Sequence, residues 1–451
     1  MPSLVWFRRD LRLSDNPAVA AALRDGPATG IFVIDPVLWQ RSGPRRRSYL
    51  AASLRRLSSG IAAVGGVGLS IHIGDPRQVV PDLAQRSSAT VHATADFGPY
   101  GAARDTAVAD RCSIRFAGSP FLHDPGSVTK PDGSGYRVFT PFYRAWRSLP
   151  IPAPQPGPAA WDAAPDAVER GPGWTVIDHE PDPPFAVGEE AARLRWERFV
   201  QERLAGYATM RDFPARGGTS GLSAALKFGE VHPRWLVADA GLLPGGEAFI
   251  RQLCWRDFYG HLLAELPQSA RRNVQPVFDG VAWQAGPQAD DAFAAWRQGR
   301  TGYPMVDAGM RELAERGSMP NRLRMVVASF LVKDLHLDWR RGARYFMQQL
   351  YDGDLANNQH GWQWTAGTGT DAAPYHRIFN PVLQGLRFDP EGDYVRRWVP
   401  QLRALAGAAA HEPWRQPRSL WPDYPDRIVD HAAERDAAMA IYRAAKPAAA
   451  P

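Results

Sequence analysis

Short apolar runs alternate with helical stretches in the first part of the chain. The predicted strands are residues 4–7, 30–35, 69–73, 91–93 and 114–116, and the segments between them are long enough for helices. Strands that alternate with helices form parallel sheets covered by helices on both faces. The pattern therefore predicts an N-terminal α/β domain with a doubly wound parallel sheet.

The glycines near the first strands do not suggest a dinucleotide clamp. No GxGxxG motif follows the first strand, and the Gly-rich stretch 65–68 precedes a strand. That position is typical of a helix end and turn rather than of a phosphate-binding loop.

The hydrophobic pattern changes after residue 150. Residues 150–184 are dense in Pro and Gly, which cannot sustain a helix or a central strand, so they are predicted to form an interdomain linker. Helical periodicity follows at 191–204, 248–266, 305–316, 323–335 and 343–350. We expect an α/β domain over 1–130, a Pro-rich linker over 131–190, an all-α domain over 191–445 and a disordered tail over 446–451.

The amino-acid composition argues against membrane, secreted and zinc-binding proteins. The chain has 451 residues, 45% of them hydrophobic, and no apolar run approaches the roughly 20 residues of a membrane span. The N-terminus lacks the apolar core of a secretory signal, and two cysteines are too few for a disulfide framework or a zinc site. These features predict a soluble, metal-free, cytoplasmic protein.

The net charge of +6 would suit a polyanionic partner. Only four of the 53 basic residues are Lys, however, and this bias toward Arg is also what genome composition produces. Charge alone leaves nucleic-acid binding open.

Three segments of the helical region contain polar and aromatic side chains that could bind a ligand. Hydroxyls in the Gly-rich turn 218–223, which follows Tyr207 and Arg211, suit a pyrophosphate, although an ordinary capped helix start has the same pattern. Segments 319–325 and 352–364 combine acids, amides and tryptophans that suit a ribose and a heterocycle; a calcium loop at 352–354 fails for lack of regular oxygen ligands. Residues 255–259, Trp-Arg-Asp-Phe-Tyr, combine aromatic rings that can stack on a base with a cation that can contact a phosphate, as in sites that bind flipped bases. The same residues would also fit a buried helix with a surface ion pair.

These motifs together resemble the photolyase/cryptochrome family, and most closely the class I cyclobutane pyrimidine dimer photolyases. The resemblance rests on LVWFRRDLRLSDN at 4–16, GTSGLS at 218–223, WRDFY at 255–259, TGYPMVD at 301–307, NRLRM at 321–325, DGDLANN at 352–358 and IFNP at 378–381. The motifs occur in order over most of the chain. The resemblance implies light-dependent DNA repair by a reduced flavin, FADH⁻, which gives an electron to a flipped-out pyrimidine dimer.

Carried over position by position, the resemblance implies two residue sets. The FAD set would be Tyr207, Thr219, Ser220, Gly221, Leu222, Ser223, Arg256, Asn321, Arg324, Asp352, Asp354 and Asn358, with Asn358 facing flavin N5. The DNA and dimer set would be Arg211, Gln252, Trp255, Arg256, Tyr259, Asn321, Arg322, Met325 and Trp364. Two positions depart from the pattern: Gly221 stands where many relatives have Arg, and Gln252 where cyclobutane dimer photolyases usually have Glu.

The resemblance also implies an electron route and a second pigment. Trp296, Trp339 and Trp362 match the chain that reduces the flavin from the surface, although packing would also explain them. Asp35, Arg46, Asp96, Tyr100 and Lys227 resemble an antenna site of the deazaflavin type rather than the methenyltetrahydrofolate type. UV-damaged DNA would be the partner of a monomer with no obligate protein partner and no membrane contact.

Three alternatives remain at this stage. A cryptochrome photoreceptor shares the scaffold, but many cryptochromes carry a long C-terminal extension. A (6-4) photolyase usually has His where this chain has Asn321. A generic FAD electron carrier would explain the cofactor but not the aromatic and basic set expected to bind the dimer.

Overall fold

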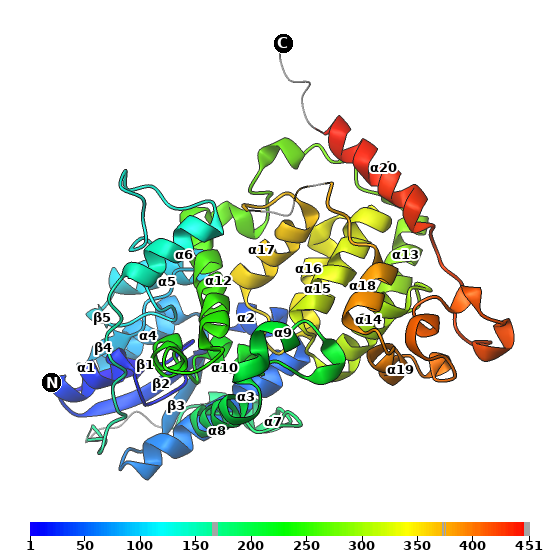
Figure 1. The fold of residues 1–451 in the computed structure, drawn as a ribbon. Helices are drawn as coiled ribbons and strands as arrows, with labels where there is room; N and C mark the ends of the chain where they lie inside the picture. The colour runs from blue at the N-terminus through cyan, green and yellow to red at the C-terminus, as the bar shows by residue number, and fades with distance from the viewer. Residues whose placement is uncertain (165–169, 372–373, 375, 446–451) are drawn as a thin grey trace. The chain divides into compact units, whose positions relative to one another are not determined.

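The computed structural model describes residues 1–164, 170–371, 374 and 376–445 (Figure 1). Packing divides the chain into two compact units. The first comprises Met1–Ala205, Ser220–Pro267 and Tyr351–Ala356, and the second comprises Gly206–Thr219, Gln268–Leu350 and Asn357–Pro451. This division differs from the expected boundary near residue 190, because segments distant in the sequence pack into each unit.

The first unit contains a five-stranded parallel sheet in the order β3-β2-β1-β4-β5. Its strands are β1 Ser3–Trp6, β2 Ala28–Ile34, β3 Leu69–Ile73, β4 Thr90–Ala93 and β5 Ile114–Phe116. The chain runs outward from β1 to one edge and then returns past β1 to build the other half. The predicted doubly wound α/β sheet is confirmed.

Both faces of the sheet are buried, as expected for parallel strands covered by helices. Val5 and Phe7 pack with Leu54 and Ile61 of α3 (Pro44–Ala63) on one face. Trp6, the intervening residue, packs on the other face with residues of α4 (Pro76–Arg86), because side chains alternate along a strand.

Local signals explain where the helices of this unit begin. Asn16, Asp35 and Asp75 each precede a proline, and their side chains accept hydrogen bonds from the first free backbone N–H groups of the helix. Its other helices are α1 Pro17–Asp25, α2 Pro36–Arg41, α5 Pro99–Ala109, α6 Phe139–Ser148, α7 Gly173–His179, α8 Glu189–Glu202, α10 Ser223–Phe228, α11 Pro233–Ala240 and α12 Gly246–Glu265.

The predicted linker is more ordered than its composition suggests. Helix α7 lies within it, contrary to the prediction that residues 150–184 contain no helix. Trp174 of this helix is buried and its indole N–H donates to the backbone oxygen of Leu69 at 2.9 Å. Tertiary packing of one aromatic residue against the sheet therefore outweighs the local Pro and Gly content.

The second unit is helical, as predicted. Its helices are α9 Tyr207–Met210, α13 Pro287–Arg297, α14 Pro304–Arg316, α15 Asn321–Ser329, α16 Trp339–Gln349, α18 Pro381–Phe388, α19 Asp393–Trp398 and α20 His431–Ala444, while α17 Leu355–Ala366 begins within the first unit's last segment. A π-helix, Phe330–Asp334, continues α15. One large apolar core, which includes Trp296, Trp339 and Trp362, holds the unit together.

Within the described ranges, no helix combines the length and apolar composition needed to cross a bilayer. The same residues contain no group of three or more His, Cys, Asp or Glu side chains placed to hold a metal ion. The predicted tail, residues 446–451, lies outside the described residues.

Candidate active site

One face of α12 carries four of the predicted DNA-contacting residues. Gln252, Trp255, Arg256 and Tyr259 recur at helical spacing, so they share a face. Trp255 is partly exposed, and one side of its ring stacks on Phe139 with centroids 3.7 Å apart and planes 3° from parallel. A supported indole with an accessible surface is suited to stacking on a base.

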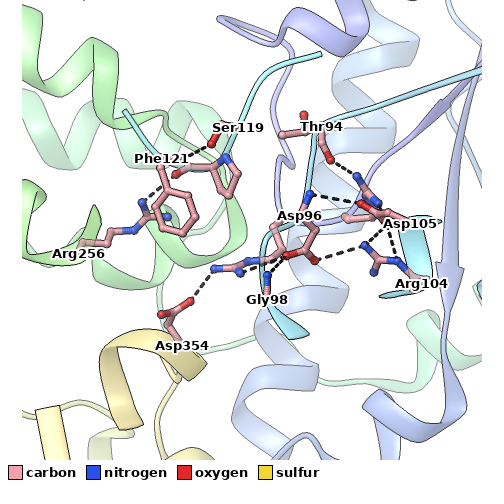
Figure 2. Close-up of polar contacts among 12 residues, drawn as sticks. Thr94, Asp96, Gly98, Arg104, Asp105, Ser119, Phe121, Arg256 and Asp354 are labelled. Carbon is pink, nitrogen blue, oxygen red and sulfur yellow. Dashed lines mark hydrogen bonds and ion pairs between the residues drawn. The ribbon is translucent and has the colours of Figure 1, made fainter. Parts of the chain in front are cut away.

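Arg256 occupies a different environment from its neighbours. Its guanidinium is buried and donates to the backbone oxygens of Pro120 at 2.8 Å and Leu226 at 3.2 Å (Figure 2). Burial lowers the pKa of Arg256, with Asp257 opposing, while burial raises the pKa of Asp257 to about 6. Arg256 thus ties α12 to the loop at residue 120, and a flavin contact is an additional role that stays a prediction.

The Gly-rich turn 218–223 leads into α10. The α-helix begins at Ser223, and the Thr219 and Ser223 side chains are exposed. Gly221 has φ +66°, in the left-handed region that favours glycine. The departure from Arg at this position is therefore compatible with the local backbone.

The loop at 352–354 is joined to the N-terminal sheet by Arg9. The Arg9 guanidinium contacts the carboxylate of Asp354 at 2.6 Å and that of Asp96 at 4.0 Å. Both carboxylates, Asp354 and Asp96, are labelled in Figure 2. Burial opposes the charge of Asp96, but Arg9, Arg104 and Arg8 outweigh it and lower the pKa of Asp96. Arg9 thus contacts a predicted FAD residue, and motif reading did not single it out although it stands inside the N-terminal FRRD motif.

The predicted antenna residues all belong to the first unit. Asp35 caps α2 and accepts a hydrogen bond from the Tyr100 hydroxyl. Burial lowers the pKa of Arg46 to about 10. Burial also lowers the pKa of Lys227 to about 7; the charges of Arg9 and Arg46 act in the same direction, and Asp354 and Asp352 oppose them. This concentration of positive charge suits an anionic ligand.

In the second unit, Arg322 and Arg211 both lie beside Asp212. The Arg322 guanidinium contacts the Asp212 carboxylate at 3.0 Å and lies 4.2 Å from the centre of the Phe388 ring. Arg211 lies over Tyr207 at 5.7 Å. Both arginines are only partly buried, so they remain available to phosphate groups.

The amide residues predicted to contact the flavin lie at different depths. Asn321 is exposed at the start of α15, where its amide nitrogen donates to the sulfur of Met325 at 3.5 Å. The amide nitrogen of Asn358 donates to the backbone oxygen of Ala343 at 3.0 Å and to Gln359 at 2.9 Å. The side-chain oxygen of Asn358 can accept a hydrogen bond from an N–H donor. Arg324 donates to the backbone oxygen of Met319 at 2.9 Å.

All three predicted relay tryptophans are buried: Trp296 and Trp339 are 0% exposed and Trp362 is 3% exposed. Trp362 packs on α16 at Gly342, one turn after Trp339, while its ring centroid lies 6.2 Å from that of Trp296. The three residues do not by themselves reach the surface, so the predicted route from the surface is incomplete.

Trp283 was not predicted as a site residue, but it is partly exposed and packs against the same core. The backbone N–H of its neighbour Gln284 donates to the oxygen of His336, three residues before Trp339. No local motif marks Trp283, because only the fold brings residues 283 and 336 together. Phe139 under Trp255 was missed for the same reason, since it belongs to the predicted linker.

The predicted sites draw on both units. Of the FAD set, Ser220, Gly221, Leu222, Ser223, Arg256, Asp352 and Asp354 belong to the first unit and Tyr207, Thr219, Asn321, Arg324 and Asn358 to the second. Of the DNA set, Gln252, Trp255, Arg256 and Tyr259 belong to the first, and Arg211, Asn321, Arg322, Met325 and Trp364 to the second.

Two family models match the chain. Residues 3–159 match the DNA photolyase model, and residues 249–444 match the FAD binding domain of DNA photolyase. The deoxyribodipyrimidine photo-lyase of Vibrio cholerae is 39% identical over 484 residues, covering 98% of this chain and 99% of the relative.

Solved structures show the same fold. A class III photolyase from Agrobacterium tumefaciens has a TM-score of 0.90 and 36% identity, covering 98% of this chain and 97% of that one. A cryptochrome from Synechocystis sp. has a TM-score of 0.89 and 28% identity over 98% and 99% of the two chains. The predicted class I assignment stays a prediction, since a class III enzyme is among these neighbours. Because curated relatives match it over nearly their full length, the chain belongs to the DNA photolyase family of enzymes.

Proposed function

We propose that this chain repairs cyclobutane pyrimidine dimers in DNA in a light-dependent reaction that uses bound FAD. The observation that carries the proposal is the face of α12, on which the partly exposed Trp255 is held flat by Phe139 beside Gln252. The relatives named deoxyribodipyrimidine photo-lyase support the same activity.

The donor chemistry of the chain fits FAD. The hydroxyls of Thr219, Ser220 and Ser223 would hold the pyrophosphate and ribityl chain, and Asp354 and Asn358 would contact the ribose and isoalloxazine. When bound and reduced, the cofactor supplies a light-excited electron that opens the cyclobutane ring and then returns. The protein's own task is to bind, orient and exclude water.

Residues of the predicted DNA and dimer set would hold the damaged bases in place. Trp255 and Trp364 would stack on a pyrimidine dimer that has left the duplex, with Met325 as an apolar wall. Gln252 interacts only weakly within its own helix, at 3.5 Å from the oxygen of Ala248. Its amide can donate to a thymine carbonyl and accept from a ring N–H, so it can replace the usual Glu.

We expect Gln252→Glu to preserve or modestly raise cyclobutane dimer repair. A charge-assisted hydrogen bond adds on the order of 1 kcal/mol, or about fivefold, over a neutral one. The measurement is dimer loss under illumination, against a dark control, in separate cyclobutane and (6-4) thymine-dimer oligonucleotides. Gln298→Glu, at an exposed position after α13, adds the same charge elsewhere and serves as the control.

Turnover of only the (6-4) lesion would refute the substrate assignment. Turnover of neither lesion, with the flavin chemically reduced, would favour the photoreceptor alternative. A cryptochrome is among the solved structures with the same fold.

We propose that a second, anionic chromophore of the deazaflavin type binds in the first unit beside Lys227. Because its pKa is lowered to about 7, the side chain is charged below pH 7 and loses its charge above it. An anion that needs the charged form should bind up to about tenfold more weakly for each pH unit above 7. We expect reconstitution with a deazaflavin to show this dependence, and Lys227→Met to remove it.

Lys130→Met is the matched control, because Lys130 is a partly exposed lysine of the same unit whose amine donates to the Ser134 hydroxyl at 3.1 Å. An extracted pterin would refute the deazaflavin assignment. Pigment affinity that does not change between pH 7 and pH 9 would refute the role of Lys227.

We also propose that electrons enter from the surface through Trp283 and Trp339 toward Trp362. Trp283 has the solvent exposure that Trp296 lacks, and it lies beside the segment leading into α16. In this route Trp296 is a packing residue, whose indole N–H donates to the backbone oxygen of Val327 at 2.9 Å.

A further inference from the structure

A second arginine of α12 lies beside the stacked pair of Trp255 and Phe139. Arg251 precedes Trp255 by four residues, so the two side chains share one face of the helix. The Arg251 guanidinium lies 4.9 Å from the centre of the Phe139 ring and 5.0 Å from that of the Tyr143 ring. Both rings belong to α6, so Arg251 packs against the helix that also supports Trp255.

The charge of Arg251 is available to a ligand. The side chain is partly exposed, and no carboxylate of the described residues forms an ion pair with it. Glu247, one turn earlier on α12, pairs with Arg147 at 3.3 Å instead. Stacking on aromatic rings uses the flat faces of a guanidinium, whereas its N–H groups point outward in the plane. These groups can therefore donate to the oxygens of a phosphate.

The position of Arg251 suits the backbone of a nucleotide that is stacked on Trp255. Four residues of a helix span about 6 Å along its axis. The long side chain of Arg251 extends this reach, so the phosphate of the stacked nucleotide, or the next one along the strand, would lie close to the guanidinium. A cation that is held by two rings and lacks a carboxylate partner is well placed to bind it.

We propose that Arg251 binds a backbone phosphate beside the pyrimidine dimer and is held in position by Phe139 and Tyr143. The proposal rests on the proposed function, in which Trp255 stacks on the damaged bases. Phosphate contacts add affinity and fix the position of the strand, but they do not recognise the bases. Arg251 therefore strengthens binding to damaged and undamaged DNA alike, whereas Gln252 and Trp255 provide the preference for the dimer.

The test is the affinity of the full chain with bound FAD for two duplexes, measured in the dark over a range of salt concentrations. One duplex carries a single cyclobutane thymine dimer, and the other has the same sequence without it. Arg251→Met should weaken binding to both by about tenfold, as losing one charge-assisted hydrogen bond does. It should also lower the slope of log affinity against log salt by about 0.7 to 0.9, because one phosphate fewer is neutralised.

Three further variants separate charge from packing. Arg251→Gln removes the charge but keeps a long polar side chain, and it should lower the slope as Arg251→Met does. Arg251→Lys keeps the charge and should retain the slope. Arg24→Met, at an exposed arginine of α1, is the matched control and should change neither the affinity nor the slope. Flavin content and melting temperature verify that each variant is folded.

An unchanged salt slope in both Arg251→Met and Arg251→Gln would overturn this proposal alone. A loss of affinity confined to the duplex with the dimer would also overturn it, because Arg251 would then contact the lesion and not a phosphate. If the unsubstituted chain showed no preference for the duplex with the dimer, the proposed function itself would be contradicted.

Discussion

Trp339→Phe is expected to slow light-driven reduction of the bound FAD by about 100-fold or more while leaving repair intact once the flavin is reduced chemically. Phenylalanine fills most of the same space but lacks an indole that can be oxidised, and each factor of ten in rate corresponds to about 1.4 kcal/mol of barrier. Trp339 is fully buried and its indole N–H donates to Asn273 at 2.9 Å. The measurement is the rate of loss of oxidised-flavin absorbance under blue light with an external reductant.

Two further variants locate the surface end of the route. Trp283→Phe should slow photoreduction as Trp339→Phe does, because Trp283 is partly exposed beside the start of α16. Trp296→Phe is the matched control: it removes an equally buried indole that has no contact with solvent. Unchanged photoreduction in Trp339→Phe would refute the route, and a loss confined to Trp296→Phe would place the exit at Trp296 instead.

Asp354→Ala is expected to weaken FAD binding by about 10- to 100-fold. Removing one charge-assisted hydrogen bond costs about 1.5–3 kcal/mol, and each 1.4 kcal/mol is a factor of ten in affinity. The substitution also leaves the buried part of Arg9 without the carboxylate that contacts it at 2.6 Å. Flavin content after purification, together with titration of the apoprotein with FAD, measures the effect.

The control for this prediction is Asp96→Asn. Asp96 is the other carboxylate near Arg9, at 4.0 Å, and it does not belong to the FAD set. We expect that variant to retain its flavin. Stoichiometric flavin in purified Asp354→Ala would show that Asp354 only positions Arg9.

Most secondary-structure elements and the chemistry they carry could be predicted from the amino-acid sequence alone. Apolar periodicity located all five strands and several long helices, among them α8, α12 and α14, because burial on a sheet or helix face imposes a fixed spacing. The four residues on one face of α12 could also be predicted, since helical spacing alone places Gln252 beside Trp255 and Tyr259. The family motifs predicted the DNA photolyase family, which the comparisons confirm, whereas the residue sets for FAD and DNA stay predictions.

Which distant residues come into contact depends on the tertiary fold and could not be predicted from the sequence. The ring of Phe139 under Trp255, the contact of Arg9 with Asp354 and the position of Trp283 beside His336 each join segments far apart in the chain. Burial could not be predicted either, because nothing in the local sequence shows that Trp296 and Lys333 are inaccessible to solvent. Exposure and charge state depend on what packs against a side chain, and hydrophobic spacing specifies a face without specifying its partner.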